Sequence, residues 1–142
     1  MIWNVYLRRG MLYVPTVART ESGLYLDVEP VGVAAATDAD AVRKVVRSAI
    51  ERGNPAIPTP ARGAFPKPVV LRHAGMQSWS EFERATSSLA VAHRDGRFRI
   101  IPRRKGDEGG WEDDVSATEV LDPSAGSEDV ARRIVVLIGS HR

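Results

Sequence analysis

The stretch Leu24-Tyr25-Leu26-Asp27-Val28-Glu29-Pro30 alternates apolar and polar side chains and then reaches a proline. Successive side chains of a strand point to opposite faces of a sheet, so the alternation predicts a strand with one apolar and one polar face. Asp27 and Glu29 belong to the polar face. Glu21-Ser22-Gly23 before the strand is typical of a hairpin turn, and Pro30 is expected to end it.

A helix is predicted shortly after this strand. Thr37-Asp38-Ala39-Asp40 has the form of a helix N-cap with a carboxylate three residues further on. Apolar residues then recur at helical spacing, and these are Val42, Val45, Val46, Ala49 and Ile50. Gly53 supplies the stop signal that often follows a helix.

The same order of strand and helix recurs in the second half of the chain. Gly96-Arg97-Phe98-Arg99-Ile100-Ile101-Pro102 echoes residues 23–30, and Asp129-Val130-Ala131-Arg132-Arg133-Ile134-Val135 echoes residues 40–46. A structural duplication accounts for this echo, and chance is the alternative, because turns, strands and helices share such residues. The pattern predicts an α+β fold of two antiparallel β-sheets, each followed by a helix (four strands and a helix, repeated), in a single domain of residues 1–142.

The other segments complete this order of elements. Further strands are predicted at Ile2–Arg9, Met11–Arg19, Val31–Ala36, Val69–His73, Ser88–His93, Arg97–Arg103 and Trp111–Leu121. One helical turn is predicted at Ser78–Glu83, and a last helix begins at Ser127. Asn54–Pro68 contains five prolines and is predicted to be an extended connection.

The composition narrows the class of protein. The 142 residues include 20 Lys and Arg and 18 Asp and Glu, which are interspersed, so the net charge of +2 is weak support for nucleic-acid binding. The sequence has no cysteine, which excludes disulfides and thiolate chemistry. We find no signal-peptide pattern and no apolar run of roughly 18 residues, and we therefore expect a cytoplasmic protein.

The most informative functional feature is Arg103-Arg104-Lys105-Gly106-Asp107-Glu108-Gly109-Gly110-Trp111-Glu112-Asp113-Asp114. Three cations precede five carboxylates around one tryptophan, on a glycine-rich loop that suits contact with a charged macromolecule. We predict a partner-binding role for Asp107, Glu108, Trp111, Glu112, Asp113 and Asp114. Trp111 has two open interpretations, an interior residue at the start of a strand or an aromatic anchor in an interface.

A basic strip precedes this loop and supports an alternative function. It consists of Arg97, Arg99, Arg103, Arg104 and Lys105. Cations beside aromatic residues could bind single-stranded nucleic acid. The neighbouring carboxylates would weaken such binding, and a solvated hairpin face with internal ion pairs explains the strip more simply.

The sequence offers no convincing active site. Asp27 and Glu29 could bind a metal or act as acid and base, but a solvated sheet face shows the same pattern, so we place them on a partner-facing surface. His73, His93 and His141 lack the spacing of a metal site or a triad. The glycine-rich loop is acidic and lacks a phosphate-binding motif. We therefore expect no enzymatic activity, no metal and no cofactor.

Five segments resemble the immunity proteins of bacterial contact-dependent growth inhibition systems, and the resemblance covers most of the chain. They are Ile2-Trp3-Asn4-Val5-Tyr6, Leu12-Tyr13-Val14-Pro15-Thr16, Gly23-Leu24-Tyr25-Leu26-Asp27-Val28-Glu29-Pro30-Val31, Phe65-Pro66-Lys67-Pro68-Val69-Val70-Leu71 and Gly110-Trp111-Glu112. The resemblance implies a protein that binds the toxin domain of its own strain's secreted effector and covers its active site or substrate surface. It also implies that the toxin is a nuclease, whose cationic groove an anionic loop would fit.

The order of elements is also similar to that of whirly proteins, in which two four-stranded antiparallel sheets each precede a helix. Whirly proteins bind single-stranded DNA, but their lysine-glycine-lysine signature is absent here. This second resemblance therefore implies an architecture and not an activity. Toxin binding is the leading prediction, and binding of single-stranded nucleic acid by a whirly-like domain is the alternative.

Overall fold

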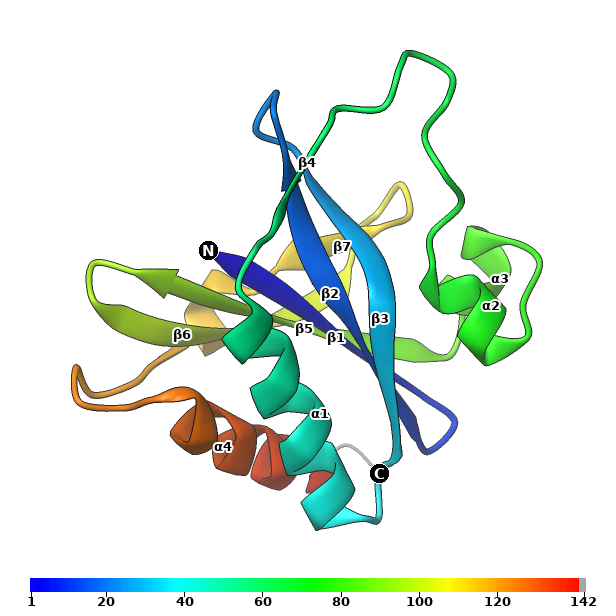
Figure 1. The fold of residues 1–142 in the computed structure, drawn as a ribbon. Coiled ribbons are helices and arrows are strands. Elements are labelled where there is room, and N and C mark those ends of the chain that lie inside the picture. Colours follow the sequence, from blue (N-terminus) through cyan, green and yellow to red (C-terminus); the bar gives the residue numbers. More distant parts are fainter. Residues whose placement is uncertain (141–142) are drawn as a thin grey trace.

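The computed structural model describes residues 1–140 (Figure 1). Its strands are β1 (Ile2–Arg8), β2 (Met11–Thr20), β3 (Tyr25–Ala35), β4 (Ala56–Ile57), β5 (Thr86–Arg94), β6 (Arg97–Lys105), β7 (Trp111–Asp113) and β8 (Glu119–Val120). Its helices are α1 (Ala39–Arg52), α2 (Val70–Ala74), α3 (Trp79–Glu83) and α4 (Ser127–Gly139), with a 3-10 turn at Val115–Ala117.

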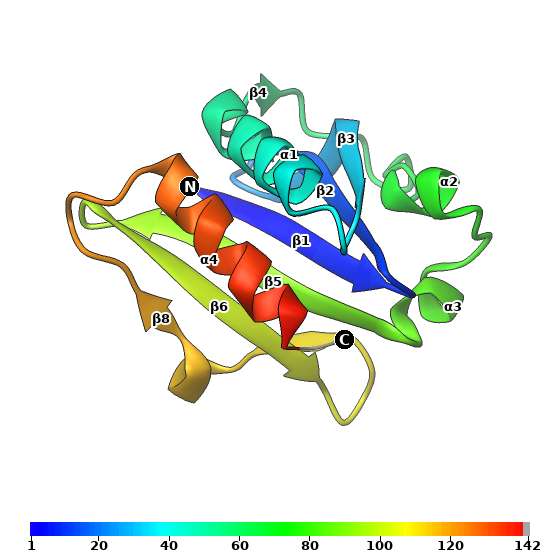
Figure 2. The same ribbon diagram turned by 90° about the horizontal axis from the view of Figure 1, so that it is seen from below.

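The strands form one sheet whose main path runs β3-β2-β1-β5-β6-β7 (Figures 1 and 2). Neighbours on this path are antiparallel, while β4 joins β2 in parallel and β8 pairs with β6. The predicted α+β class is confirmed, and each half contributes antiparallel strands followed by a long helix. The two predicted sheets are joined into one because β1 pairs with β5 from Ile2 opposite Ala92 to Arg8 opposite Thr86.

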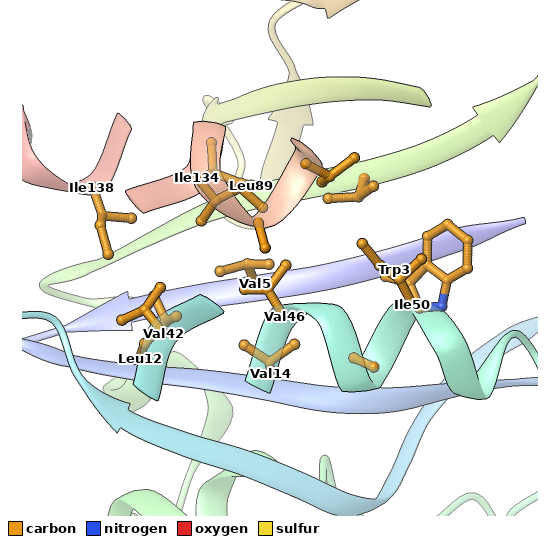
Figure 3. Close-up of a cluster of buried hydrophobic side chains, with 14 of the residues drawn as sticks. Trp3, Val5, Leu12, Val14, Val42, Val46, Ile50, Leu89, Ile134 and Ile138 are labelled. Atoms are coloured by element: carbon orange, nitrogen blue, oxygen red, sulfur yellow. The ribbon is translucent and has the colours of Figure 1, made fainter. Parts of the chain in front are cut away.

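Helices α1 and α4 cover one face of the sheet, and the main core lies between them and the strands (Figure 2). Figure 3 shows side chains of both helices meeting those of the strands, among them Val42, Val46, Ile50, Ile134 and Ile138 from the helices and Trp3, Val5, Leu12, Val14 and Leu89 from the strands. The apolar stripes that predicted both helices are therefore their buried faces. None of the helices within residues 1–140 is long and apolar enough to cross a membrane.

The opposite face of the sheet carries a smaller apolar cluster, to which α2 and α3 contribute. It joins Tyr6 and Tyr13, next to the β1–β2 hairpin, to Val70 and Leu71 of α2 and Phe82 of α3. The predicted helical turn at Ser78–Glu83 is confirmed as α3, and the Ser78 hydroxyl caps it by accepting a hydrogen bond from the Glu81 N–H at 3.2 Å. Of the helices in residues 1–140, only the short α2 and α3 pack on this side of the sheet, which we call the open face.

The prediction of a strand at Val69–His73 is wrong, because the segment forms helix α2. Val70 and Leu71 are adjacent in sequence and both are buried in the smaller cluster. A strand would send such neighbours to opposite faces, whereas a helix can bury both on one side. Gly75, with φ at 68°, then ends the helix in the left-handed conformation.

Pro30 does not end its strand, contrary to expectation, and the segments predicted as separate strands at 24–29 and 31–36 form the single strand β3. The pairing with β2 shifts register, since Pro15 lies opposite Val31 while Thr16 lies opposite Val28. Glu29 and Pro30 are thus the extra residues of a bulge, where the missing proline N–H costs no ladder hydrogen bond.

The segment Trp111–Leu121 does not form one strand either. It pairs with β6 through β7 and again through β8, and the 3-10 turn at Val115–Ala117 separates the two. Asp95 and Gly96, both at positive φ, form the turn between β5 and β6. Asn54–Pro68 is an extended connection apart from the short strand β4.

Gly32 of β3 lies against α1 with no room for a side chain. A Cβ at this position would lie 2.7 Å from the Val45 Cβ and 2.9 Å from its Cγ1. We expect Gly32→Ala to lower the free energy of unfolding by about 1–3 kcal/mol, the usual cost of overpacking, in chemical denaturation. Val33→Ala is the control, because Val33 is the next residue along β3 and is 39% exposed. This substitution should cost less than about 1 kcal/mol. Equal losses in the two variants would contradict the close contact between β3 and α1.

Candidate partner-binding surface

A chain of polar side chains crosses the open face of the sheet. The Asp27 carboxylate accepts hydrogen bonds from Asn4 Nδ2 and from the Tyr6 hydroxyl, both at 2.7 Å. Arg103 Nη1 donates to Asn4 Oδ1 at 2.9 Å, and Arg103 Nε donates to Asp113 Oδ1 at 3.3 Å. These residues come from β1, β3, β6 and β7, so only the folded sheet brings them together.

Burial raises the pKa values of two groups in this hydrogen-bonded network, the Asp27 carboxyl and the Tyr6 hydroxyl. Burial raises the pKa of Asp27 above its ordinary value, although hydrogen bonds from Tyr6 and Asn4 and the charge of Arg103 act in the opposite direction. Burial and the neighbouring Asp27 carboxylate together hold the pKa of the Tyr6 hydroxyl well above its ordinary value. Tyr6 is therefore a hydrogen-bond donor at neutral pH, and Asp27 is a carboxyl group in a poorly solvated position.

The two carboxylates that the alternation of β3 places together have different surroundings. The expectation that both face water is wrong for Asp27, which is partly buried in the polar chain. Glu29 is exposed, forms an ion pair with Arg72, and lies 3.0 Å from His73 Nε2. The hydrogen bond from His73, followed by the charges of His73 and Arg72, lowers the pKa of Glu29.

His73 and His93, the two histidines within residues 1–140, have separate surroundings. His73 lies beside Glu29, the His93 ring packs on Phe98 with ring centroids 4.5 Å apart, and His141 lies outside the described residues. Within residues 1–140 no group of three or more His, Asp or Glu side chains could hold a metal ion.

Trp111 packs inside an aromatic group beside the hydrogen-bonded polar side chains of the open face. Its ring centroid lies 5.7 Å from that of Tyr6 and 5.5 Å from that of Trp79, and Phe82 completes the group. The Lys105 ammonium lies 5.2 Å from the Trp111 ring centroid, within range of a cation–π contact. Trp111 is partly buried, so its ring stabilises the open face as well as forming part of its surface.

The carboxylates of the β6–β7 hairpin fall into two groups. Glu112 lies 3.8 Å from Arg104, and Asp113 pairs with Arg103, so these two are neutralised by their own strand partners. Asp114 accepts a hydrogen bond from the Ser116 hydroxyl at 2.7 Å. Asp107 and Glu108 are exposed near the tip, and no side chain in the described part of the chain forms an ion pair with them.

The cations of the basic strip predicted from the sequence do not all lie on one face of the sheet. Alternation along β6 places Arg97, Arg99, Arg103 and Lys105 on the open face and Arg104 on the other face. Arg103 is only 17% exposed and is held by Asn4 and Asp113. Arg97 is exposed at the far end of β6, and Arg99, two residues along the strand, is partly buried.

Two adjoining pockets open beside Asp27, with volumes of about 460 Å³ and about 270 Å³. Both are lined by Asp27 and by Pro66, Lys67 and Pro68, which belong to the extended segment that arches from β4 to α2 (Figure 1). Asn4 and Lys67 also belong to this site, although neither was predicted from the sequence. The signal for Asn4 was an amide side chain inside the otherwise apolar strand Ile2–Tyr6. Lys67 carried no such signal, because only the fold brings the proline-rich segment next to β3.

We expect Trp111→Ala to lower the free energy of unfolding by about 2–3 kcal/mol, less than the roughly 3–5 kcal/mol of a fully buried aromatic residue. The loss follows from removing the contacts with Tyr6 and Trp79, and denaturant unfolding measures it. Trp111→Phe keeps an aromatic ring and should lose less than half as much. An unchanged melting temperature in Trp111→Ala would instead favour a role in an interface alone.

Asp27 should make the free energy of unfolding depend on pH. Its pKa in the folded protein is raised above the value of about 3.9 in an unfolded chain, so the stability that it contributes is present at low pH and is lost as the pH rises through the folded pKa. We expect the wild-type protein to lose stability relative to Asp27→Asn as the pH rises from about 4 to about 7.

Glu29→Gln is the control for this pH dependence. Because the pKa of Glu29 is lowered, its contribution is present above its unfolded pKa of about 4.3 and is lost as the pH falls through the folded pKa. The wild-type protein should therefore gain stability relative to Glu29→Gln as the pH rises. Denaturant unfolding across the pH series measures the stability difference between the wild-type protein and each variant. If this difference changes with pH in the same direction for both variants, the pKa of Asp27 is not raised while that of Glu29 is lowered.

No protein-family model matches the sequence, and no curated protein matches it. Solved structures share its fold. A protein of unknown function from Neisseria meningitidis has a TM-score of 0.66 and 12% sequence identity, over 96% of this chain and 93% of that chain. A chain of the CdiA-CT/CdiI toxin and immunity complex from Yersinia pseudotuberculosis has a TM-score of 0.59 and 13% identity, over 96% of this chain and 95% of that chain. The likeness is therefore one of fold, and it extends over nearly the whole length of each chain.

Proposed function

We propose that this protein is an immunity protein, which binds and neutralises the toxin domain of a contact-dependent growth inhibition effector. The observation that carries the proposal is the agreement of fold, over 96% of the chain, with a chain of a toxin and immunity complex. In this proposal residues 1–142 act as a single cytoplasmic domain, without catalysis or a cofactor, and capture the toxin before it reaches its substrate.

The proposed toxin is a nuclease, and the immunity protein covers its active site or substrate surface. The exposed carboxylates Asp107 and Glu108 support this, because they lack ion-pair partners in the described residues and lie on a projecting hairpin. A nuclease groove that binds phosphates is cationic, so such carboxylates would attract it and speed association. Glu112 and Asp113 contribute less net charge, since each has an arginine beside it.

The contact must extend beyond the hairpin tip. A standard interface buries about 800 Å² on each partner, roughly a tenth of the 7900 Å² surface of this chain. The open face of the sheet adjoins the hairpin through the Arg103–Asp113 ion pair and presents Glu29 and the pockets beside Asp27. We therefore include Asp27, Glu29, Trp111 and Asp114 in the proposed contact surface.

The experiment that tests this function is protection from a toxin. The probes are the C-terminal domains of large secreted effectors from the same strain, each expressed under tight control in a susceptible host. The chain alone should leave growth unchanged, should restore growth when one of these toxins is induced, and should copurify with that toxin domain. Growth arrest by the chain itself, or killing at full rate by every one of these toxins in its presence, would refute the proposal.

Neutralising the two unpaired carboxylates tests the hairpin. We expect Asp107→Asn with Glu108→Gln to slow association with the toxin domain by about tenfold at low salt, with a smaller effect at high salt, because screening weakens long-range attraction. Surface plasmon resonance at two salt concentrations measures both rates. Glu21→Gln with Glu81→Gln removes the same charge elsewhere and should slow association much less. Equal effects of the two double variants would show that only net charge matters.

The alternative function is tested with the wild-type protein and with the variant that combines Asp107→Asn and Glu108→Gln. A domain that binds single-stranded DNA through Arg97, Arg99, Arg103, Arg104 and Lys105 should show affinity that falls steeply with salt. It should also bind more tightly once Asp107 and Glu108 are neutral. Our proposal expects weak binding to a single-stranded oligonucleotide in the wild-type protein. Tight, salt-sensitive binding would favour the nucleic-acid function instead.

A further inference from the structure

We propose that the pocket between β3 and the segment Pro66–Met76 receives an arginine side chain of the bound toxin, with Asp27 as the carboxylate that recognises its guanidinium. This inference rests on the proposed immunity function and names the chemistry of one of its contacts. Three features of the pocket support it, namely its shape, the state of the Asp27 carboxylate, and the charges at its rim.

The pocket has the size and lining for a long basic side chain. Its volume of about 460 Å³ lies within the roughly 300–1,000 Å³ of ordinary ligand sites. Much of its wall is apolar, from Val28, Val69, Leu71, Met76 and the prolines 66 and 68. Arginine buries its methylene stem along such walls while its charged end seeks a polar group.

Four charged side chains and Gln77 line the pocket, and the charged ones are Asp27, Glu29, Lys67 and Arg72. Asp27 is the carboxylate among them that is partly buried and that forms no ion pair within residues 1–140, whereas Glu29 is exposed and paired with Arg72. Asp27 Oδ1 accepts one hydrogen bond from Asn4 and Oδ2 accepts one from Tyr6. A carboxylate can accept about four, so each oxygen keeps one acceptor position free. Two parallel acceptors match the two parallel N–H donors of a guanidinium, whereas a lysine ammonium would use only one of them well.

Asp27 also lacks a cation of its own. Arg103, although nearby, directs its hydrogen bonds to Asn4, Ser88 and Asp113, and no ion pair to Asp27 exists within residues 1–140. Burial accordingly raises the pKa of Asp27. An entering guanidinium would therefore supply the positive charge that this position lacks in the free protein.

Two cations at the rim of the pocket, Arg72 and Lys67, affect how strongly a guanidinium should bind there. Arg72 is 73% exposed and is paired with Glu29, so it is already neutralised. Lys67 is exposed, lines both pockets, and pairs with no carboxylate in the described part of the chain. Its charge should repel an incoming guanidinium, so removing that charge should strengthen binding.

The test uses a small probe that needs no toxin. Acetyl-arginine methylamide is titrated into the ¹⁵N-labelled wild-type protein, and the shifts of the Asp27 amide and the Trp79 indole N–H are followed. We expect a saturable shift and binding that is about tenfold tighter than that of acetyl-citrulline methylamide, which has the same shape without the charge. Equal affinity for the two probes, or no saturable shift, would overturn the proposal.

Two variants make the assignment specific. Asp27→Asn should abolish the difference between the two probes, and its melting curve shows whether it folds. Lys67→Gln, on the exposed segment, should bind the arginine probe about threefold more tightly. If Asp27→Asn fails to fold, Lys67→Gln alone decides, and unchanged or weaker binding in that variant rejects the pocket.

The toxin itself then separates this inference from the proposed function. Asp27→Asn, folded and assayed with the toxin domain, should lose affinity by tenfold or more through faster dissociation. Full affinity in this variant would reject the arginine pocket while immunity stands. Failure of the wild-type chain to protect would reject immunity, and the probe titration would still decide the chemistry of the pocket.

Discussion

The pairing of β1 with β5 is the interaction on which the rest of the structure depends. It joins the strands of the first half to those of the second along the whole of β1. Because the two halves become one sheet, α1 and α4 lie side by side on the same face and close a common core over Trp3, Val5 and Val91. Neither helix could bury its apolar stripe as fully against its own strands alone, so the junction makes the two halves one cooperative layer.

The same junction organises the opposite face. On β1 the residues that alternate with Trp3 and Val5 are Asn4 and Tyr6, and both donate hydrogen bonds to Asp27 of β3. Asn4 also accepts a hydrogen bond from Arg103 of β6, so it connects β3 with β6 across this face. Arg103 continues the chain to Asp113 at the base of the charged hairpin. The hairpin and the pocket beside Asp27 are far apart in sequence, yet hydrogen bonds make them parts of one surface.

The two faces of the sheet thus differ in what they contribute. The face under α1 and α4 is apolar and buried, and it provides most of the stability. The open face holds partly buried polar groups that satisfy one another, an arrangement that adds little net stability but defines geometry. A surface of fixed shape with exposed carboxylates and a lined pocket suits recognition of another protein, which is the function we propose.

Periodicity in the sequence determined the strands, the two long helices and the α+β class, because local alternation and helical spacing record which side of an element meets the core. Segments that lack a long period were harder. Val69–His73 is too short to distinguish a buried strand from one turn of helix, and the route of β3 past Pro30 depends on a bulge that only the partner strand reveals.

The sequence also showed where carboxylates gather, at Asp27 and Glu29 on one strand and along the hairpin from Asp107 to Asp114. Only the tertiary structure decided which of these charges are free. Asp27 becomes partly buried because Asn4 and Tyr6 lie within reach, whereas Glu112 and Asp113 meet arginines across a strand pair. Neutralisation depends on distances between residues remote along the chain, and local sequence patterns do not encode those distances.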